Sequence, residues 1–419
     1  MAELIELKQE KERVILVGVS AREGDDTENS MKELEELAKT AGAVTVGAVI
    51  QNRESVHPAT YVGKGKIDEI KELIWETDAD GIICDDELTP AQMNNLQEEL
   101  DAKVMDRTLL ILDIFAGRAK TSEGKIQVEL AQLKYRQSRL TGFGRAMSRL
   151  GGGIGTRGPG EKKLEMDRRL IKNRIAQLSR ELKEVRKHRE ITREQRLRTK
   201  IPVIAIVGYT NAGKSTLLNT LTGAGVLEED QLFATLDPTT RNLKLPSGQE
   251  ILLTDTVGFI RKLPHHLIEA FKSTLEEAKY ADVILHVVDA SNPQMEQQMY
   301  TVYETLRGLE VVDKPILTAF NKQDKEGVSG TAKDFQADEV VFISAKTGMG
   351  LDRLTESLEQ ILRKGKMAIE HVYPYEEAGK IQTIRKYGEL LEEEYREEGV
   401  FVRAYVPVDI GKELLGKGK

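Results

Sequence analysis

Short apolar runs alternate with amphipathic stretches over the first 118 residues of the chain. The runs have the length of buried strands, and the stretches between them carry apolar residues at the three-and-four spacing of helices. One helix is expected to begin after Thr89, a residue type that caps helices, with Pro90 in the first helical position. Repeated strand–helix units predict a small parallel α/β domain. The apolar runs span residues 14–20, 43–50, 81–86 and 103–106.

Three details of this domain carry separate expectations. Trp75 lies near helical spacing from Ile67 and Ile70, so we expect it in the core and not stacked on a base. Cys84 stands in an apolar run and is expected to be buried, and as the single cysteine it excludes a disulfide framework. The loop 62–66 is rich in glycine and lysine but lacks the spacing of a phosphate-binding loop. We expect its lysines to meet phosphate or solvent rather than to form a second nucleotide site.

The apolar pattern becomes a longer helical repeat in residues 119–200. Two matching apolar seams predict an antiparallel helical hairpin. Residues 141–160 between them are too rich in glycine for regular helix, and Pro159 is expected near the start of the second helix. The seams consist of Ile126, Leu130, Leu133, Gln137 and Leu140 on one helix and Ile171, Ile175, Leu178, Leu182 and Val185 on the other, with Leu164 one heptad before Ile171.

From residue 201 onward strands and helices alternate again, and four of the five apolar runs end in a polar cluster. Ligands bind to open parallel sheets just beyond the carboxyl ends of the strands, so these clusters are candidate site residues. Residues 225–243, between the first two runs, are polar and turn-rich, which predicts a loop ordered by a ligand. The runs span residues 201–207, 250–259, 282–290, 314–320 and 340–344.

The first polar cluster runs from Gly208 through Tyr-Thr-Asn-Ala to Gly213, Lys214 and Ser215, and it matches G-x-x-x-x-G-K-[ST] between a strand and a helical pattern. In that setting the loop amides and the helix N-terminus bind phosphates. We expect Lys214 to reach the β and γ phosphates and the Ser215 hydroxyl to coordinate Mg²⁺.

Two further clusters complete a nucleotide site. Asp255 is placed to hold a Mg²⁺-bound water, and the Gly258 amide to sense the γ phosphate. In Asn321-Lys-Gln-Asp324, the carboxylate accepts from the ring N1–H and exocyclic N2–H of guanine, a donor pair that adenine lacks. A buried carboxylate left unpaired against adenine costs about 1–3 kcal/mol or more, so GTP is predicted over ATP. Ser344 and Ala345 are expected to support the base.

Two points about hydrolysis stay open at this stage. Thr235, Thr239 and Thr240 are all candidates to give a second hydroxyl to Mg²⁺, and the residues do not rank them. The position after D-x-x-G, where many GTPases have a water-orienting glutamine, is Phe259. We therefore predict slow unaided hydrolysis, with the water oriented by another residue or by a partner acting on residues 259–266, while Phe259 itself packs.

Charge changes the picture of the partner. The 419 residues carry 61 Lys+Arg against 69 Asp+Glu, a net charge of −8 that argues against nucleic acid. Residues 117–200 nevertheless carry a net +15, and residues 131–160 hold six basic residues, eight glycines and no acid. The arginine guanidinium can donate two hydrogen bonds to one phosphate, and glycine allows the protein backbone to approach phosphates closely. This segment is therefore predicted to bind folded RNA. The candidate RNA contacts are Arg139, Arg145, Arg149 and Arg157.

The location expected for this protein is the cytoplasm. No apolar run reaches the roughly 18 residues that a membrane span needs. The acidic first ten residues lack both the basic and the apolar region of a secretory signal. We expect no membrane anchor and a monomer.

These residues together resemble the HflX family of ribosome-associated GTPases. The likeness rests on GYTNAGKST, LFATLDPTTR, DTVGFIRKLPHHLIEAFKSTLEEA and NKQD in the GTPase part. It rests equally on GGGIGTRGPGEKKLEMDRR and ESVHPATYVGKGKIDEI outside it, so it covers nearly the whole chain.

The patterns along the chain together predict a multi-domain α/β protein. Its parts are a parallel α/β domain (1–118), a basic helical hairpin (119–200), a Ras-like P-loop GTPase domain (201–365) and a small C-terminal α+β domain (366–419). The last part is expected to contain an acidic helical stretch at 389–398 and a strand at 400–406.

The resemblance implies a function. Family members bind the large ribosomal subunit near the peptidyl-transferase region, split stalled ribosomes in the GTP state, notably under heat stress, and hydrolyse GTP faster on ribosomal particles. It marks Lys214, Thr235 and Gly258 as catalytic, and Ser215, Thr235 and Asp255 as Mg²⁺ ligands. The implied contacts to GTP or GDP are Gly208, Tyr209, Thr210, Asn211, Ala212, Gly213, Lys214, Ser215, Thr216, Phe233, Ala234, Thr235, Leu236, Asp237, Asp255, Thr256, Val257, Gly258, Asn321, Lys322, Gln323, Asp324, Ser344, Ala345 and Lys346.

A second function fits the same residues: an RNA-binding factor for ribosomal-subunit assembly whose GTPase acts only as a timer. A membrane-trafficking GTPase is disfavoured, because the sequence shows no lipidation signal or amphipathic anchor.

Overall fold

The structure is a computed structural model of the chain and describes residues 11–20, 26–147, 159–199, 201–223, 232–233, 235–264, 277–328 and 330–415. The chain divides into two compact units. Unit 1 comprises residues 1–185 and 262–270, and unit 2 comprises residues 186–261 and 271–419. No helix among the described residues is both long and apolar enough to span a membrane.

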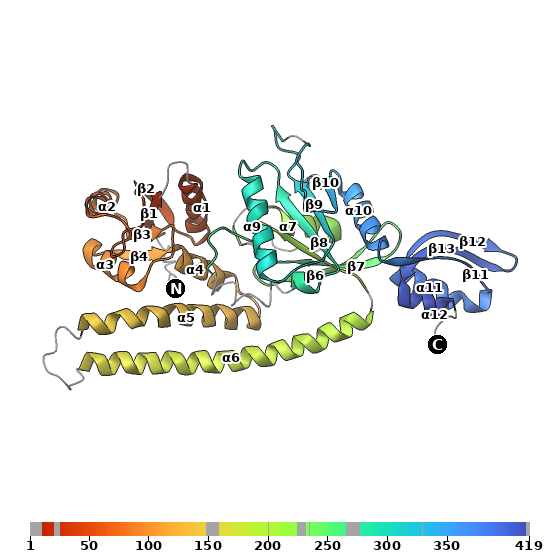
Figure 1. Cartoon of the computed structure of the whole chain (residues 1–419), viewed down its shortest axis with the longest axis horizontal. Coiled ribbons are helices and arrows are strands. Elements are labelled where there is room, and N and C mark those ends of the chain that lie inside the picture. The colour runs from red at the N-terminus through yellow and green to blue at the C-terminus, as the bar shows by residue number, and fades with distance from the viewer. Residues whose placement is uncertain are drawn as a thin grey trace, which may run out of the picture. The chain divides into compact units, whose positions relative to one another are not determined.

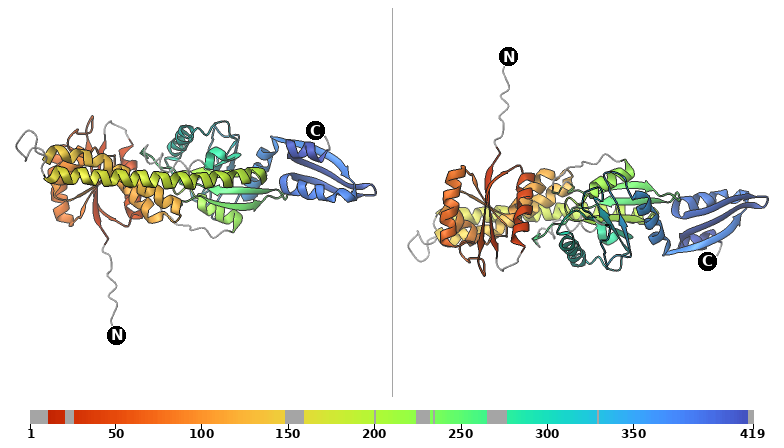
Figure 2. Two further views of the ribbon diagram at one scale, coloured as in Figure 1. Left: turned by 90° about the horizontal axis from the view of Figure 1, so that it is seen from below. Right: turned by 90° about the horizontal axis from the view of Figure 1, so that it is seen from above.

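Unit 1 contains a parallel four-stranded sheet covered by helices on both faces. Its elements are β1 (Arg13–Ser20), α1 (Thr27–Thr40), β2 (Val44–Asn52), α2 (Lys64–Thr77), β3 (Gly81–Cys84), α3 (Pro90–Leu100), β4 (Lys103–Asp106) and α4 (Arg107–Arg118). The strand order is β2-β1-β3-β4. Helices α1 and α4 contact each other on one face, and α2 and α3 on the other (Figures 1 and 2). The expected parallel α/β fold is confirmed.

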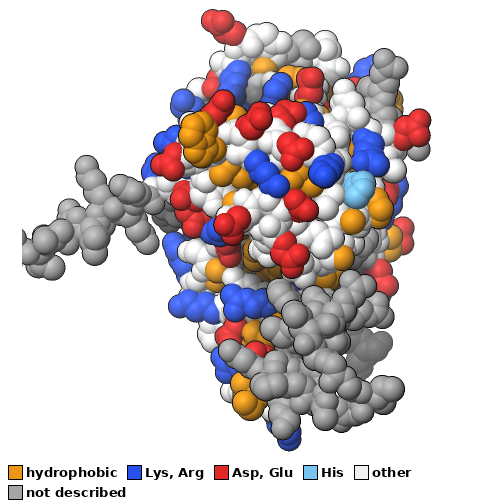
Figure 3. All heavy atoms as spheres, turned by 90° about the vertical axis from the view of Figure 1, so that its left-hand side faces the viewer, with side chains coloured by type: hydrophobic (Ala, Val, Ile, Leu, Met, Phe, Trp, Pro, Cys, Tyr) orange, Lys and Arg blue, Asp and Glu red, His pale blue; other side chains and the backbone are white. Residues whose placement is uncertain are grey.

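Local sequence signals explain where these elements begin. Thr89 accepts a hydrogen bond from the Gln92 amide, and the Gln92 side chain accepts from the Thr89 amide, so α3 starts in a capping box with Pro90 at its first turn. Cys84 is buried, as expected. Acidic and basic side chains are mixed over the face of unit 1 drawn in Figure 3.

The expectation for Trp75 was wrong, because its side chain is 86% exposed. Ile67 and Ile70 form the buried stripe of α2. A position eight residues after Ile67 is rotated by roughly 80° on a helix of 3.6 residues per turn, so Trp75 leaves the stripe.

A helical hairpin completes unit 1, as the apolar seams predict. It is formed by α5 (Ser122–Met147) and by the part of α6 (Pro159–Thr199) that belongs to this unit. The expected end of the first helix at residue 140 was wrong, because the backbone stays helical through residues 141–147 despite two glycines, each of which costs only about 1 kcal/mol in a helix. Leu130 of α5 packs against Leu178 and Leu182 of α6. Ile126, Leu133 and Ile175 border this cluster, and an Arg174–Glu129 ion pair crosses between the helices at 2.8 Å.

Unit 2 begins with a six-stranded sheet in the order β10-β9-β8-β5-β7-β6. Its elements are β5 (Val203–Gly208), α7 (Lys214–Thr222), β6 (Thr239–Lys244), β7 (Glu250–Asp255), β8 (Val283–Asp289), α9 (Met295–Gly308), β9 (Ile316–Asn321), β10 (Glu339–Phe342) and α10 (Leu351–Arg363). All neighbours are parallel except β6, which pairs antiparallel with β7 at the edge.

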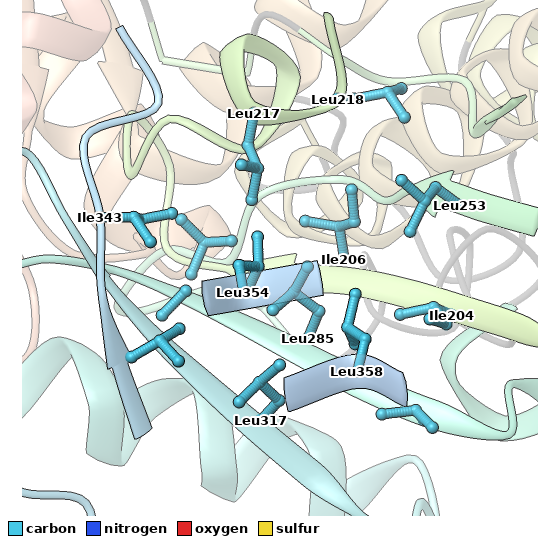
Figure 4. Packing of buried hydrophobic residues seen from close by; sticks show 14 of the residues in the cluster. Ile204, Ile206, Leu217, Leu218, Leu253, Leu285, Leu317, Ile343, Leu354 and Leu358 are labelled. Atoms are coloured by element: carbon cyan, nitrogen blue, oxygen red, sulfur yellow. The ribbon is translucent and has the colours of Figure 1, made fainter. Parts of the chain in front are cut away.

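The core of this sheet lies between the strands and helices α7 and α10. Leu217 of α7 and Leu354 and Leu358 of α10 are fully buried against strand residues such as Ile206 and Leu285 (Figure 4). On the opposite face, Met299 of α9 packs on Val288 and Phe320. Helices on both faces keep the carboxyl ends of the strands as the edge where polar loops gather.

One strand of this sheet was missed. We expected residues 225–243 to form a loop, but Thr239–Lys244 is the edge strand β6. Its Thr-Thr-Arg-Asn-Leu-Lys sequence is too polar to stand out, because an edge strand has a partner on one side only.

The C-terminal part of unit 2 has a small antiparallel sheet in the order β11-β13-β12. The elements are β11 (Lys366–Tyr373), a short 3-10 helix (Tyr375–Glu377), α11 (Ala378–Tyr387), β12 (Glu389–Arg396), β13 (Gly399–Pro407) and α12 (Val408–Leu414). Apolar side chains of β13, α11 and α12 form one core. The expected α+β composition is present.

The acidic stretch at 389–398 is a correction to the predicted helix. Glu389–Arg396 is strand β12, paired antiparallel with β13. Glutamate favours helices, but sheet pairing and ion pairs such as Arg385–Glu393 outweigh that weak preference.

Candidate functional site

The loop after β5 surrounds the ammonium group of Lys214. Its Nζ donates to the carbonyl oxygens of Gly208 at 3.1 Å and Tyr209 at 2.7 Å. The side chain is 6% exposed, and this burial lowers the pKa of Lys214 to about 8, against the opposite influence of Asp255. A buried cation at a helix N-terminus makes this loop suitable for an anion.

Gly213 closes the loop at a position where no other residue fits. Its φ is +95°, and a Cβ there would lie 2.2 Å from Nδ2 of Asn321. Both the left-handed backbone and the close approach therefore require glycine.

Asn321 joins three of the predicted clusters through one buried amide. Its Nδ2 donates to the carbonyl of Ala212 in the phosphate loop at 2.8 Å. Its Oδ1 accepts from the backbone amide of Ala345 at 2.8 Å. The side chain is 2% exposed, so it fixes the loops after β5, β9 and β10 to one another.

The groups expected to recognise the base lie beside this junction. Asp324 accepts from the Ser344 hydroxyl at 2.6 Å, and that hydrogen bond lowers the pKa of the Asp324 carboxyl. The ionised Asp324 carboxylate is exposed and not buried, although the predicted preference for guanine over adenine assumed burial. A bound base would cover it, and the carboxylate can accept hydrogen bonds from such a ligand. Lys322 has a φ of +66° and pairs with Asp289 at the end of β8, with Nζ 2.7 Å from the carboxylate.

The three predicted Mg²⁺ ligands meet at one point. Ser215 Oγ lies 2.8 Å from Thr235 Oγ1 and 2.8 Å from Asp255 Oδ2, and Thr235 Oγ1 lies 3.0 Å from the same carboxylate oxygen. The other carboxylate oxygen, Oδ1, is buried without a hydrogen-bond partner among the described residues. Burial raises the pKa of Asp255. This set of oxygens suits a hard cation.

Among the three candidate threonines, Thr235 alone has been placed at this point. Thr240 shares a hydrogen bond with Thr254 in the sheet at 3.0 Å, and Thr239 begins β6.

Phe259 packs, as expected. It is 2% exposed, and its backbone forms a short parallel bridge with Tyr209. The Phe259 amide donates to Gly208 at 3.1 Å, and the Thr210 amide donates to Phe259 at 2.8 Å. The segment after Gly258 is thereby held against the phosphate loop.

The remaining expected contacts are distributed around this edge. Phe233, Leu236 and Val257 are buried, and Thr256 donates to Ile206 at 2.8 Å. Ala234 lies outside the described residues. The others stand in the same loops or at their ends: Asn211, Thr216, Asp237, Gln323 and Lys346.

The expected RNA contacts are placed differently from one another. Arg139 is 12% exposed on its side chain and pairs with Asp106 at 2.8 Å within unit 1, stacked over the Tyr135 ring. Arg139 therefore holds α5 against the sheet, and its charge is already paired with Asp106 and does not point outward to RNA. Arg145 lies in α5 with its side chain outside the description, and Arg149 and Arg157 lie outside the described residues.

Sequence reasoning missed two contributions to this site. Asp289 as the partner of Lys322 had a usable signal, because it stands at the carboxyl end of a buried strand like the other site residues. The double hydrogen bonding of Asn321 had no signal, since its partners are backbone groups.

Comparisons with known proteins agree with this geometry. Three family models match in succession: "GTP-binding GTPase N-terminal" at residues 28–116, "GTP-binding GTPase Middle Region" at 118–196 and "50S ribosome-binding GTPase" at 203–322. GTPase HflX of Lacrimispora saccharolytica is 68% identical over 410 residues, covering 98% of this chain and 97% of the relative.

The chain belongs to the HflX GTPase family. GTPase HflX of Escherichia coli is 40% identical over 408 residues, covering 95% of this chain and 94% of that protein. A GTP-binding protein from Sulfolobus solfataricus, solved with GDP, is 27% identical, with a TM-score of 0.45 over 84% of this chain and 99% of its own. Because the chain belongs to the HflX family and matches the GTPase family models, it is a GTPase, and the predicted resemblance is confirmed.

Proposed function

We propose that the loops after β5, β7, β9 and β10 bind GTP in this chain and that GTP occupancy controls binding to the large ribosomal subunit. One observation carries the nucleotide part. The buried Asn321 side chain ties the phosphate loop to the loop that supports the base, so both ends of a nucleotide are held by one rigid edge.

The residues are assigned as follows. Lys214 and the loop amides bind the β and γ phosphates, and the carbonyl contacts that now hold its ammonium show that the cation already points into the loop. Asp324 accepts the two guanine donors while Ser344 keeps its carboxylate oriented. Gly258 offers its amide to the γ phosphate.

Mg²⁺ fits the oxygens of Ser215, Thr235 and Asp255, and the unpartnered Asp255 Oδ1 supports the assignment. These three residues would hold Mg²⁺ together with the nucleotide, where the cation would neutralise charge on the phosphates.

The ribosomal part of the proposal is supported by the family and by charge. One matched family model is described as a 50S ribosome-binding GTPase. Residues 117–200, which include the hairpin, carry a net +15. We propose that this segment contacts ribosomal RNA near the peptidyl-transferase region through Arg145, Arg149 and Arg157, and that the protein acts as a cytoplasmic monomer.

In the GTP state the protein would then split stalled ribosomes, including those formed under heat stress, and hydrolysis would release it. The test is sucrose-gradient sedimentation of intact ribosomes with the full chain and a non-hydrolysable GTP analogue. Conversion of 70S particles into subunits, absent with Lys214→Ala, is the expected result. Binding to immature subunits alone, with intact ribosomes unchanged, would contradict splitting and support an assembly factor instead.

A further inference from the structure

The γ-phosphate end of the proposed site lacks the usual group for orienting water. In hydrolysis the water oxygen forms a bond to the γ phosphorus, the bond from that phosphorus to the β–γ bridging oxygen breaks, and the water proton passes to the released phosphate. Phe259, next to Gly258, has no side-chain hydrogen-bonding atom and is 2% exposed. The water must therefore be held by another group, and a polar side chain next to Gly258 is a candidate.

Thr210 is brought to this end by the backbone. Its amide donates to the carbonyl of Phe259 at 2.8 Å, in the same pairing that joins Phe259 to Gly208. A Cβ at Gly258 would lie 2.9 Å from both Cα and Cγ2 of Thr210, and 3.0 Å from Nζ of Lys214. The Thr210 side chain, the Gly258 backbone and the Lys214 ammonium thus lie close together at this end of the loop.

The Thr210 hydroxyl is unpartnered. The residue is 6% exposed, and its Oγ1 is buried with no hydrogen-bond partner among the described residues. Buried hydroxyls are normally paired, so an unpaired one at a site calls for an explanation. A ligand that enters the site supplies one.

Neighbouring hydroxyls are already engaged. Thr256 donates to Ile206 at 2.8 Å, and the Tyr209 hydroxyl accepts from the Arg261 amide at 2.8 Å. Ser215 and Thr235 are bonded to Asp255. Thr210 is the remaining hydroxyl of the described phosphate loop.

Rotation about one bond brings the hydroxyl to the right side. The methyl group of Thr210 now faces Gly258, and a 120° step in χ1 to another staggered rotamer moves the hydroxyl to the place of the methyl, and the methyl to the place of the β hydrogen. The backbone does not need to move. A hydroxyl can accept a hydrogen bond from water and donate a hydrogen bond to a phosphate oxygen at the same time.

We propose that the Thr210 hydroxyl holds the attacking water at the γ phosphate, in the role that glutamine has in other GTPases. Thr210 acts by position and not as a base, because a neutral hydroxyl takes no proton at physiological pH. This inference rests on the proposed nucleotide site and is independent of the ribosome.

The test compares Thr210→Val, which keeps the shape and removes the hydroxyl, with Thr210→Ser, which keeps the hydroxyl. The full chain is assayed without ribosomes for single-turnover phosphate release, and for GTP and GDP affinity by fluorescence titration. We expect Thr210→Val to slow hydrolysis at least tenfold while both affinities stay within about threefold, and Thr210→Ser to recover most of the rate. Thr222→Val, the same change at the end of α7, is the matched control and should stay within twofold in rate.

Three outcomes would overturn the inference: an unchanged rate in Thr210→Val, a loss of affinity equal to the loss of rate, or a serine variant as slow as the valine variant. The proposed nucleotide site is tested separately: if Lys214→Ala binds GTP as tightly as the wild-type chain does, that proposal is wrong.

Discussion

Replacing Asn321 with alanine removes the side chain that connects the phosphate loop to the base-supporting loop. The carbonyl of Ala212 loses its donor, and the amide of Ala345 loses its acceptor. Both residues are 1% exposed, so water does not replace the lost partner.

The cost follows from these two groups. A buried backbone group left unpaired costs roughly 1–3 kcal/mol, so Asn321→Ala should lower the free energy of unfolding of unit 2 by about 2–6 kcal/mol. Typical domains have only about 5–15 kcal/mol in total, so the change should be easy to detect. GDP affinity should also fall at least tenfold, because the two halves of the site are no longer held together.

Urea unfolding without nucleotide and GDP titration measure the two effects. Asn242→Ala is the matched control, since Asn242 is exposed on the edge strand β6 and its replacement should change stability by less than about 0.5 kcal/mol. If Asn321→Ala unfolds and binds GDP like Asn242→Ala, the assignment of Asn321 as the connecting residue is wrong.

Three more predictions address the base, the buried histidine and the RNA. Asp324→Asn should reduce GTP affinity at least 100-fold, because two hydrogen bonds to a charged acceptor are worth about 1.5–3 kcal/mol each. The variant should favour xanthosine triphosphate, whose 2-oxo group accepts a hydrogen bond from the new amide. Competitive binding of the two nucleotides measures this preference, and an unchanged preference for GTP would contradict it. Burial lowers the pKa of His286 to about 4, so the unfolded chain binds a proton at a higher pH than the folded chain does. The free energy of unfolding therefore falls as the pH drops from 6.5 toward 4, and His286→Gln should remove on the order of 3 kcal/mol of that fall. If the free energies of unfolding of the two proteins fall in parallel over this pH range, the prediction is wrong. Joint replacement of Arg145, Arg149 and Arg157 by alanine should weaken binding to ribosomal subunits and reduce its salt dependence without altering GTP affinity, whereas unchanged subunit binding in filter assays would exclude these arginines as RNA contacts.

Much of the fold could be predicted because buried strands and helical seams leave periodic apolar patterns. The parallel strands of both units and the hairpin seam from Leu130 to Leu182 are cases where burial on one or both sides fixes the residue type. Strands β6, β11 and β12 were not recognised. Each lies at the edge of its sheet, where one side of the strand faces solvent. Polar residues are tolerated there, so the strand leaves no clear apolar pattern in the sequence.

The candidate site was predictable to the level of its clusters but not of its contacts. Phosphate-loop and base-recognition residues have fixed spacing because backbone geometry and guanine chemistry demand it. The roles of Asn321 and Thr210 depend on which backbone groups come together in the folded chain, which spacing does not reveal. For Arg139 the sequence suggested an RNA contact, because it lies in a basic stretch, but its guanidinium pairs with Asp106 inside unit 1.

The central claim is that the nucleotide bound in unit 2 governs binding to the large ribosomal subunit. The most direct test is the affinity of the full chain for purified large subunits, measured by cosedimentation with a GTP analogue, with GDP and without nucleotide. We predict at least tenfold tighter binding with the GTP analogue than with GDP, and no such difference for Lys214→Ala. Equal affinity in all three states for the wild-type chain would contradict the account, however tight that binding is.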